Sequence, residues 1–385
     1  MKGKTYILIS LLSILFVSCE KDGLPDDAIP VSDRRTVLVY LGTDNNFRAE
    51  AAEKIEILRK NRNNANDGNL LVYSDAGGVA ALIHIYHSAQ KGNVADTITV
   101  YRNENSANPA TLTRVLNDVR NYRPAASYGL VVLSHATGWL PAEMSKPTPV
   151  LRSIIWDTGT TESYNYMELA DFAEAIPYKL DFIIFDACFM GSVEVCYELK
   201  DKADYIVASP AEVVSPGFVY STIAQHLFQP QVDLTAVARD FFEYFNNQSG
   251  LYRSATVSVV KTAELEALKT LFQGIAGQAR NDTGINDIQC FGYGSQKIYF
   301  DLGDCIQKFA PEKYNDFQTA LDRCVLYKAA TDSYYSAGVA TLKPIHTFCG
   351  LSVYVPQEAY PKANELYKSL KWSKDVRSSP GGPDV

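Results

Sequence analysis

The stretch from Leu180 to Gly191 constrains the fold of this chain more than any other. Its first half is an apolar run of strand length, which is typical of a parallel strand buried on both faces. Asp186, Ala187 and Cys188 follow at once, and residues 192–199 have the pattern of an amphipathic helix. The sequence therefore predicts a thiol at the carboxyl edge of a sheet, where open α/β folds build their sites. The start of the next helix would favour a thiolate there.

A second apolar strand of the same kind lies upstream and ends in an imidazole. Residues 128–133 run into Ser134 and His135, and Gly138 follows shortly after. The imidazole is therefore also expected at the carboxyl end of a strand. If the two strands are neighbours, His135 and Cys188 lie close together as a base and a nucleophile.

These residues resemble the clostripain family of cysteine peptidases, which are relatives of caspases, legumains and gingipains. The separation of roughly 50 residues between His135 and Cys188 is that of the caspase pair. The resemblance covers nearly the whole chain after its N-terminal segment. It is carried by Ser134-His135-Ala136-Thr137-Gly138-Trp139, by Asp186-Ala187-Cys188-Phe189-Met190-Gly191, by Ala208-Ser209-Pro210 and by Gly350-Leu351-Ser352-Val353-Tyr354.

The resemblance implies a caspase-like α/β fold, with a mostly parallel central sheet, helices on both faces and a C-terminal α+β subdomain. It also implies an endopeptidase that cleaves after Arg or Lys through a Cys188–His135 dyad and a thioester acyl-enzyme. The family's oxyanion hole uses backbone amides, which correspond to Ala136 and Cys188 here. Ala136 stands where the family usually has glycine, and alanine does not readily adopt positive φ.

Asp186 has two interpretations at this stage. It lies two residues before Cys188, so both side chains share one face if the strand continues. The resemblance implies that an acid at this position binds the basic side chain of the substrate in the S1 pocket. Alternatively, Asp186 is a structural brace at the strand end, and Glu212 in the loop after Ser209 is then the first candidate for the pocket acid.

Other classes of function find less support in the sequence. The chain has no Gly-x-Ser-x-Gly elbow, Walker loop or Gly-x-Gly-x-x-Gly motif. The net charge of −8 argues against nucleic acid as a partner, because phosphate binding needs a basic surface. The main alternative is a weak or inactive surface lipoprotein that binds peptides or proteins in the same cleft.

The N-terminus is expected to be an export signal. Residues 1–4 are basic, residues 5–17 form a short apolar core, and Ser18-Cys19 resembles a lipoprotein cleavage site. We therefore expect a lipoprotein signal peptide over 1–18, a lipid on Cys19, and a membrane-anchored protein in the periplasm or on the cell surface. An ordinary secretory signal or a short membrane anchor is the alternative.

The rest of the chain divides into segments that differ in composition and in the pattern of apolar residues. We expect a polar tether over 19–35, a catalytic domain over 36–253, a C-terminal subdomain over 254–377 that includes a helix around 316–327, and a flexible tail over 378–385. Residues 140–158 form a proline-bearing loop of the length seen in lids and processing segments.

Metal, disulfide and processing sites are less clear from the sequence. His84 and His87 would face opposite sides of a strand, so we interpret them as structural. The six cysteines after Cys19 suggest no disulfide framework, and no cofactor is certain, although the resemblance makes calcium a candidate. The bond after Arg152 is the expected site of any self-cleavage, because Pro147 protects the bond after Lys146.

Overall fold

The computed structural model describes residues 32–378 except 64–67, 76, 78, 103, 141–153, 158–164 and 274–282. Within these residues the architecture is a nine-stranded sheet in the order β12-β10-β9-β8-β5-β1-β2-β3-β4. The strands are β1 (Ser32–Gly42), β2 (Gly68–Asp75), β3 (Val79–Ser88), β4 (Gly92–Arg102), β5 (Ala125–Leu133), β8 (Leu180–Asp186), β9 (Ala203–Ala208), β10 (Thr256–Lys261) and β12 (Val325–Ala330).

The centre of this sheet is parallel and its two ends are antiparallel. Strands β2, β1, β5, β8 and β9 run parallel to one another. Hairpin strands β3 and β4 extend one end, and β10 and β12 extend the other, all in antiparallel pairing. The carboxyl ends of the parallel strands therefore meet at one edge, as the apolar strand patterns predicted.

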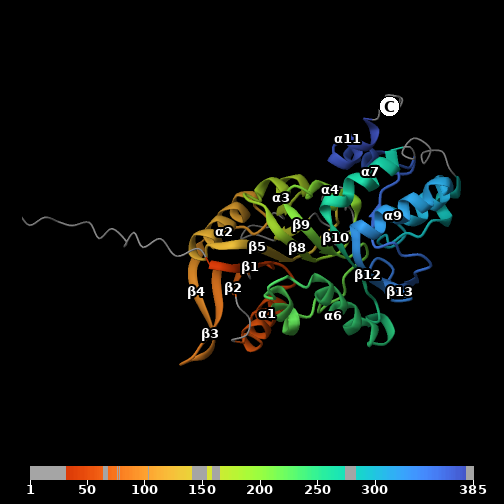
Figure 1. Cartoon of the computed structure of the whole chain (residues 1–385). Helices are drawn as coiled ribbons and strands as arrows, with labels where there is room; N and C mark the ends of the chain where they lie inside the picture. The colour runs from red at the N-terminus through yellow and green to blue at the C-terminus, as the bar shows by residue number, and fades with distance from the viewer. Residues whose placement is uncertain are drawn as a thin grey trace, which may run out of the picture. The chain divides into compact units, whose positions relative to one another are not determined.

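Helices cover both faces of the sheet, as Figure 1 shows for α2, α3 and α4 on one side and α1 and α6 on the other. The helices are α1 (Arg48–Lys60), α2 (Pro109–Tyr122), α3 (Leu169–Ala175), α4 (Val193–Glu198), α5 (Tyr220–Leu227), α6 (Leu234–Asn246), α7 (Leu265–Gln273), α8 (Leu302–Phe309), α9 (Tyr314–Cys324), α10 (Pro361–Tyr367) and α11 (Lys371–Arg377).

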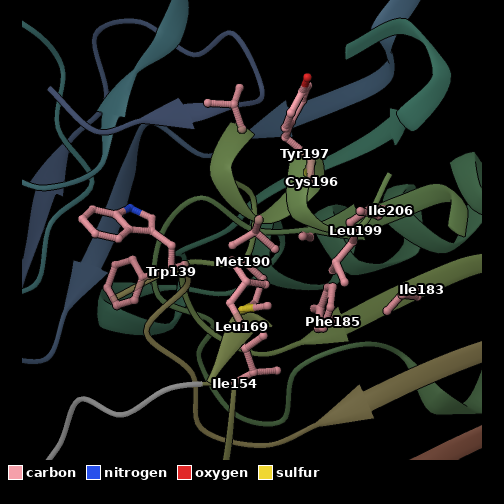
Figure 2. Close-up of a cluster of buried hydrophobic side chains, with 14 of the residues drawn as sticks. Trp139, Ile154, Leu169, Ile183, Phe185, Met190, Cys196, Tyr197, Leu199 and Ile206 are labelled. Atoms are coloured by element: carbon pink, nitrogen blue, oxygen red, sulfur yellow. The ribbon is translucent and has the colours of Figure 1, made fainter. Parts of the chain in front are cut away.

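Alternation along the central strands explains the two layers of core. On β8, Ile183 and Phe185 pack into the cluster under α2, α3 and α4, whereas Phe182 and Ile184 pack into the cluster against α1, α5 and α6. Successive side chains of a strand point to opposite faces, so a strand that is apolar throughout must be covered on both sides. Figure 2 shows part of the first cluster, where Phe185 lies among Met190, Leu199 and other buried side chains.

Short strand pairs complete the described part of the chain. They are β6 (Ile155–Asp157) with β7 (Asn165–Met167), β11 (Phe300–Asp301) with β15 (Ser352–Val353), and β13 (Ser333–Ser336) with β14 (Thr341–Pro344).

The structure differs from the expected division of the chain in two places. Strands β10 and β12 lie beyond residue 253 yet belong to the central sheet, so residues on both sides of the expected boundary build one sheet. The helix expected around 316–327 ends at Cys324 as α9, and residues 325–330 form β12 instead. Antiparallel pairing with β10, a contact between distant parts of the sequence, overrides the helical pattern there.

The expected signal peptide, tether and tail, with Cys19, lie outside the described residues. None of the helices in the described part of the chain combines the length and apolarity needed to cross a bilayer.

Candidate active site

The register between β5 and β8 brings the expected base and nucleophile to the same sheet edge. Leu133 pairs with Asp186, and His135 and Cys188 each lie two residues further along. Both side chains line one small cavity of about 30 Å³, together with Phe47, Glu50, Asp186 and the loop residues Val213, Val214, Ser215 and Gly217. Ordinary ligand pockets hold roughly 300–1,000 Å³, so the cleft is narrow in this conformation.

The loop that follows β1 holds the imidazole of His135. Asn46 Oδ1 lies 2.8 Å from His135 Nε2, and the Phe47 ring stacks on the imidazole with 4.1 Å between ring centroids. Trp156 of β6 packs at an angle on the imidazole at 5.2 Å. Because an amide oxygen only accepts, the ring nitrogen Nε2 donates in this hydrogen bond, and the lone pair of a neutral ring is then on Nδ1.

The thiol of Cys188 is covered by the loop after β9. The Val213 N–H donates to Sγ at 3.3 Å, and Sγ lies 3.8 Å from the Val213 carbonyl oxygen. Burial raises the pKa of the Cys188 thiol to about 12, and the charge of Glu212 acts in the same direction. Cys188 is only partly buried. The raised pKa favours its neutral thiol, whereas attack on a carbonyl needs the thiolate.

The residue after the nucleophile has an unusual backbone conformation. Phe189 has a φ of 61°, and its N–H donates to the Ala211 carbonyl at 3.0 Å. A non-glycine residue with positive φ is strained, and such strain persists only where the surroundings hold it. Here the ring of Phe189 stacks on Tyr299 with 4.6 Å between centroids.

Tyr299 connects the loops that carry His135 and Cys188. Its ring packs on Phe189 beside Cys188, and its hydroxyl donates to the carbonyl of Thr137, which follows His135 by two residues. Tyr299 lies beyond residue 253, so the C-terminal part of the chain holds together the segments that carry these two residues.

Ala136 causes no conformational difficulty at the expected oxyanion hole. It is buried and is not among the residues with positive φ. The position that requires glycine is 138. Gly138 has a φ of 62°, and a Cβ added there would lie 2.5 Å from the Phe189 carbonyl oxygen. Alanine at 136 is thus compatible with the backbone of the site.

Asp186 lines the cavity but is almost fully enclosed. It is 2% exposed, the Phe218 N–H donates to its Oδ1 at 3.3 Å, and a Cβ at Gly217 would lie 2.1 Å from the same oxygen. Burial raises the pKa of Asp186 to about 6, although the nearby Lys54 ammonium lowers it.

Lys54 of α1 is a buried cation next to this carboxylate. Its Nζ lies 3.8 Å from Asp186 Oδ2 and 3.5 Å from Glu50 Oε1, and it donates a hydrogen bond to the Pro216 carbonyl. The ammonium also lies 4.2 Å from the centroid of the Tyr220 ring. Buried lysines are uncommon unless they are paired. The Lys54 ammonium therefore occupies the space next to the Asp186 carboxylate.

Glu212 is directed toward the C-terminal part of the chain. Both carboxylate oxygens accept from the Ala337 N–H, at 3.0 and 3.2 Å, and burial raises the pKa of Glu212 to about 7. It does not line the cavity that holds His135, Cys188 and Asp186. Of the two candidate pocket acids, Asp186 is therefore the one beside the dyad.

The remaining sequence expectations have simple outcomes. His84 Nδ1 lies 3.1 Å from a guanidinium nitrogen of Arg123, and His87 Nδ1 lies 2.7 Å from Asn93 Oδ1. The two imidazoles therefore have separate partners. The six cysteines of the described part, including the buried core residue Cys196, are free thiols. Arg152 lies outside the described residues.

Three buried carboxylates form the one group of potential metal ligands found among the described residues. They belong to Asp44, Asp75 and Asp157, and their ligand oxygens lie within 4.8 Å of one another.

Several of these site residues were not predicted from the sequence. Asn46, Phe47 and Lys54 are not among the candidate residues that the sequence pattern indicates. Val213 and Tyr299 gave no signal, because their contacts join segments far apart in the sequence.

Comparisons with known proteins agree with this site. A model of the clostripain family of peptidases matches residues 39–378. The chain is 24% identical over 218 residues to clostripain of Hathewaya histolytica. That match covers 49% of this chain and 41% of the relative, so the chain spans less than half of that protein's length.

Solved structures extend the likeness over most of the chain. An inactive zymogen C11 protease from Parabacteroides distasonis is 33% identical, with a TM-score of 0.79 over 90% of this chain and 99% of that chain. A secreted C11 cysteine protease from Bacteroides thetaiotaomicron, in complex with an irreversible peptide inhibitor, is 28% identical, with a TM-score of 0.79 over 89% and 98%. The caspase-like α/β fold expected from the sequence is confirmed.

Proposed function

This chain belongs to the clostripain family of cysteine peptidases, and from that premise we propose that it hydrolyses peptide bonds after Arg or Lys with Cys188 and His135 as a dyad. The observation that carries the proposal is the pairing of Leu133 with Asp186, which aligns the imidazole and the thiol on neighbouring parallel strands. The inhibitor-bound C11 relative supports a cleft that accepts peptides.

The proposed chemistry follows from the tautomer of His135. With Nε2–H donating to Asn46, Nδ1 accepts the proton of Cys188, and the thiolate attacks the carbonyl carbon of the scissile bond. The backbone amides of Ala136 and Cys188 stabilise the oxyanion. His135 then protonates the leaving amine, which leaves a thioester on Cys188. Water deprotonated by His135 hydrolyses that thioester and releases the thiol and the new carboxylate.

The described conformation corresponds to a latent form of such an enzyme. Before a peptide carbonyl reaches Cys188, the hydrogen bond from the Val213 N–H to Sγ must break and the cleft must widen. Movement of the 209–217 loop would expose the sulfur and reduce the burial that now raises its pKa. The likeness to an inactive zymogen is consistent with latency.

The raised pKa of the Cys188 thiol also favours a second candidate function, in which the chain is a weak or inactive lipoprotein that binds peptides without cleaving them. An acyloxymethyl ketone with arginine next to the reactive group separates the two functions. We expect this reagent to label Cys188 covalently in the wild type, and the Cys188→Ala variant to remain unlabelled. We also expect His135→Ala to lose turnover by several orders of magnitude with thermal unfolding near normal. Substantial turnover by either variant would refute the dyad.

Asp186 is the proposed partner for the basic side chain of the substrate. Asp186 and Glu50 are the two acids that line the cavity, and Asp186 is the one on the strand that leads to Cys188. A buried carboxylate discriminates strongly in favour of a cation because leaving it unpaired costs several kcal/mol. In this proposal the substrate cation displaces Lys54 from Asp186.

Self-cleavage and localisation belong to the same proposal. Arg152–Ser153 is the candidate bond for self-cleavage, and intact-mass measurement of the wild type beside Cys188→Ala tests it. Fragments with the masses expected for cleavage after Arg152, absent from the variant, support the assignment.

We further propose export and lipidation at Cys19. Cys19→Ser should release the protein from membranes, and a soluble wild type with an unmodified N-terminus would refute the anchor.

A further inference from the structure

Three aspartates meet beneath the loop that orients His135, and each comes from a different element. Asp44 follows β1, Asp75 is the last residue of β2, and Asp157 is the last residue of β6. They are 5%, 3% and 1% exposed, and their ligand oxygens lie within 4.8 Å of one another. Like charges at this spacing repel strongly when they are buried, so the group needs a proton or a cation.

The hydrogen bonds around the group satisfy only part of it. Asp157 Oδ2 accepts from the amide and the hydroxyl of Ser106, both at 2.7 Å, and Asp44 pairs with Arg48, whose side chain is 57% exposed. Asp75 Oδ1 accepts from the Gly77 N–H at 3.4 Å. Asp75 Oδ2, in contrast, is buried and has no hydrogen-bond partner.

A second orphaned group is located beside these carboxylates. Tyr73 and Asp75 are on the same face of β2, two residues apart. The Tyr73 hydroxyl is buried and has no hydrogen-bond partner. The Tyr73 hydroxyl interacts electrostatically with Asp75 and Asp157, so it lies near both carboxylates. A donor and an acceptor that are both unsatisfied at one place indicate a missing ligand between them.

We propose that Asp44, Asp75 and Asp157 hold one hard divalent cation, with water completing its shell. The donor set is entirely oxygen, which suits Ca²⁺, Mg²⁺ or Mn²⁺, whereas zinc sites are usually built from His and Cys. The cation neutralises the buried carboxylates and uses the orphaned Oδ2 of Asp75. A water bound to the cation would accept a hydrogen bond from the Tyr73 hydroxyl.

The cation would also fasten the partners of His135 to the sheet. Asp44 is two residues before Asn46, and Asp157 directly follows Trp156, whose carbonyl accepts from Asn45 at 2.8 Å. One ion would therefore bind the loop after β1 to β6. This effect on the dyad rests on the proposed function, but the binding of the ion does not.

Terbium luminescence tests the ion directly, because the lanthanide takes hard oxygen sites and is excited by nearby aromatic rings such as Tyr73 and Trp156. The metal-stripped full chain, with Cys188→Ala to prevent proteolysis, should bind one Tb³⁺ that Ca²⁺, Mg²⁺ or Mn²⁺ displaces. The displacing cation alone should raise the unfolding temperature. Asp75→Asn should weaken affinity for the displacing cation by more than about tenfold, whereas Asp201→Asn, at an exposed position, should not.

Three results would overturn the proposal: no displaceable Tb³⁺ signal in the parent chain, undiminished affinity in Asp75→Asn, or equal losses in both variants. If Asp75→Asn does not fold, isothermal titration of the stripped parent chain decides by stoichiometry: one site supports the proposal, and none refutes it. The readouts do not involve peptide cleavage, so failure of the proposed peptidase activity leaves this test unaffected.

Discussion

Replacing Lys54 with methionine tests whether Asp186 serves the substrate or only its internal partner. Methionine keeps much of the apolar stem of lysine and removes the ammonium, which lies 3.8 Å from Asp186 Oδ2. At an effective dielectric constant of 20, unit charges at this distance attract by about 4 kcal/mol. If a substrate arginine must displace Lys54, that attraction opposes binding, and Lys54→Met should favour basic substrates.

Protonation reduces the expected gain. Lys54 lowers the pKa of Asp186, which is nevertheless about 6 because of burial. Without Lys54 the pKa rises, so more of Asp186 is neutral near pH 7, and an arginine must then displace a proton. We therefore expect kcat/KM for an Arg substrate to rise about tenfold relative to a neutral one, or about 1.4 kcal/mol. The gain should be larger at pH 8.5 than at pH 6.5.

Stability should change in the opposite direction. Breaking a buried ion pair costs about 3–5 kcal/mol when the remaining charge stays unpaired, and protonation of Asp186 limits the loss, so we expect the unfolding temperature to fall by several degrees. Lys60→Met, on the same helix but with a side chain that is 66% exposed, is the matched control and should alter neither property.

The assay is a pair of fluorogenic peptides that differ only in Arg or Leu before the scissile bond. An unchanged Arg-to-Leu ratio in folded Lys54→Met would refute the reasoning. Asp186 would then be a brace for Lys54, and the search for the pocket acid would move to Glu212.

Three further predictions follow from single contacts. Asn46→Ala removes the acceptor of His135 Nε2 and should lower kcat by about tenfold or more with little change in KM. A large fall in the unfolding temperature alongside the loss of activity would instead indicate a structural role. Burial raises the pKa of Glu194 from 4.5 to about 7, so its contribution favours folding below about pH 4.5 and is lost progressively as the pH rises from 4.5 through 7. Glu194→Gln should therefore flatten the loss of stability between pH 4.5 and 7, by on the order of 3 kcal/mol at the upper end, and an unchanged pH profile by chemical denaturation would contradict this. Gly217→Ala combines a φ of 73° with a Cβ 2.1 Å from Asp186 Oδ1, so it should destabilise the fold and reduce Arg cleavage more than Leu cleavage; a wild-type melting curve would show that the loop relaxes.

The meeting of His135 and Cys188 at one sheet edge could be predicted from the sequence because its determinants are local. The apolar run before Asp186 and the one before His135 each specify a buried strand, and parallel strands bring their carboxyl ends to one edge. The register of β5 and β8 places the two side chains as expected.

The surroundings of the dyad could not be predicted in the same way. Lys54 has the sequence context of a solvent-exposed helical lysine, but it is buried next to Pro216 and the ring of Tyr220, which lie far away in sequence. Residues 325–327 continue a helical pattern, and their strand conformation comes from β10, far away in sequence. Both outcomes depend on contacts between segments whose proximity no local pattern encodes.

The contacts of Tyr299 limit how this protein can be shortened. A fragment that ends at residue 253 would retain His135 and Cys188 but lose β10, β12 and the tyrosine that joins their two loops. Such a fragment would expose the edge of β9 to pairing with other chains. Gene truncations and stable proteolytic products of this protein should therefore retain residues through at least Tyr299 and β12, and a nick within the chain should leave both pieces associated.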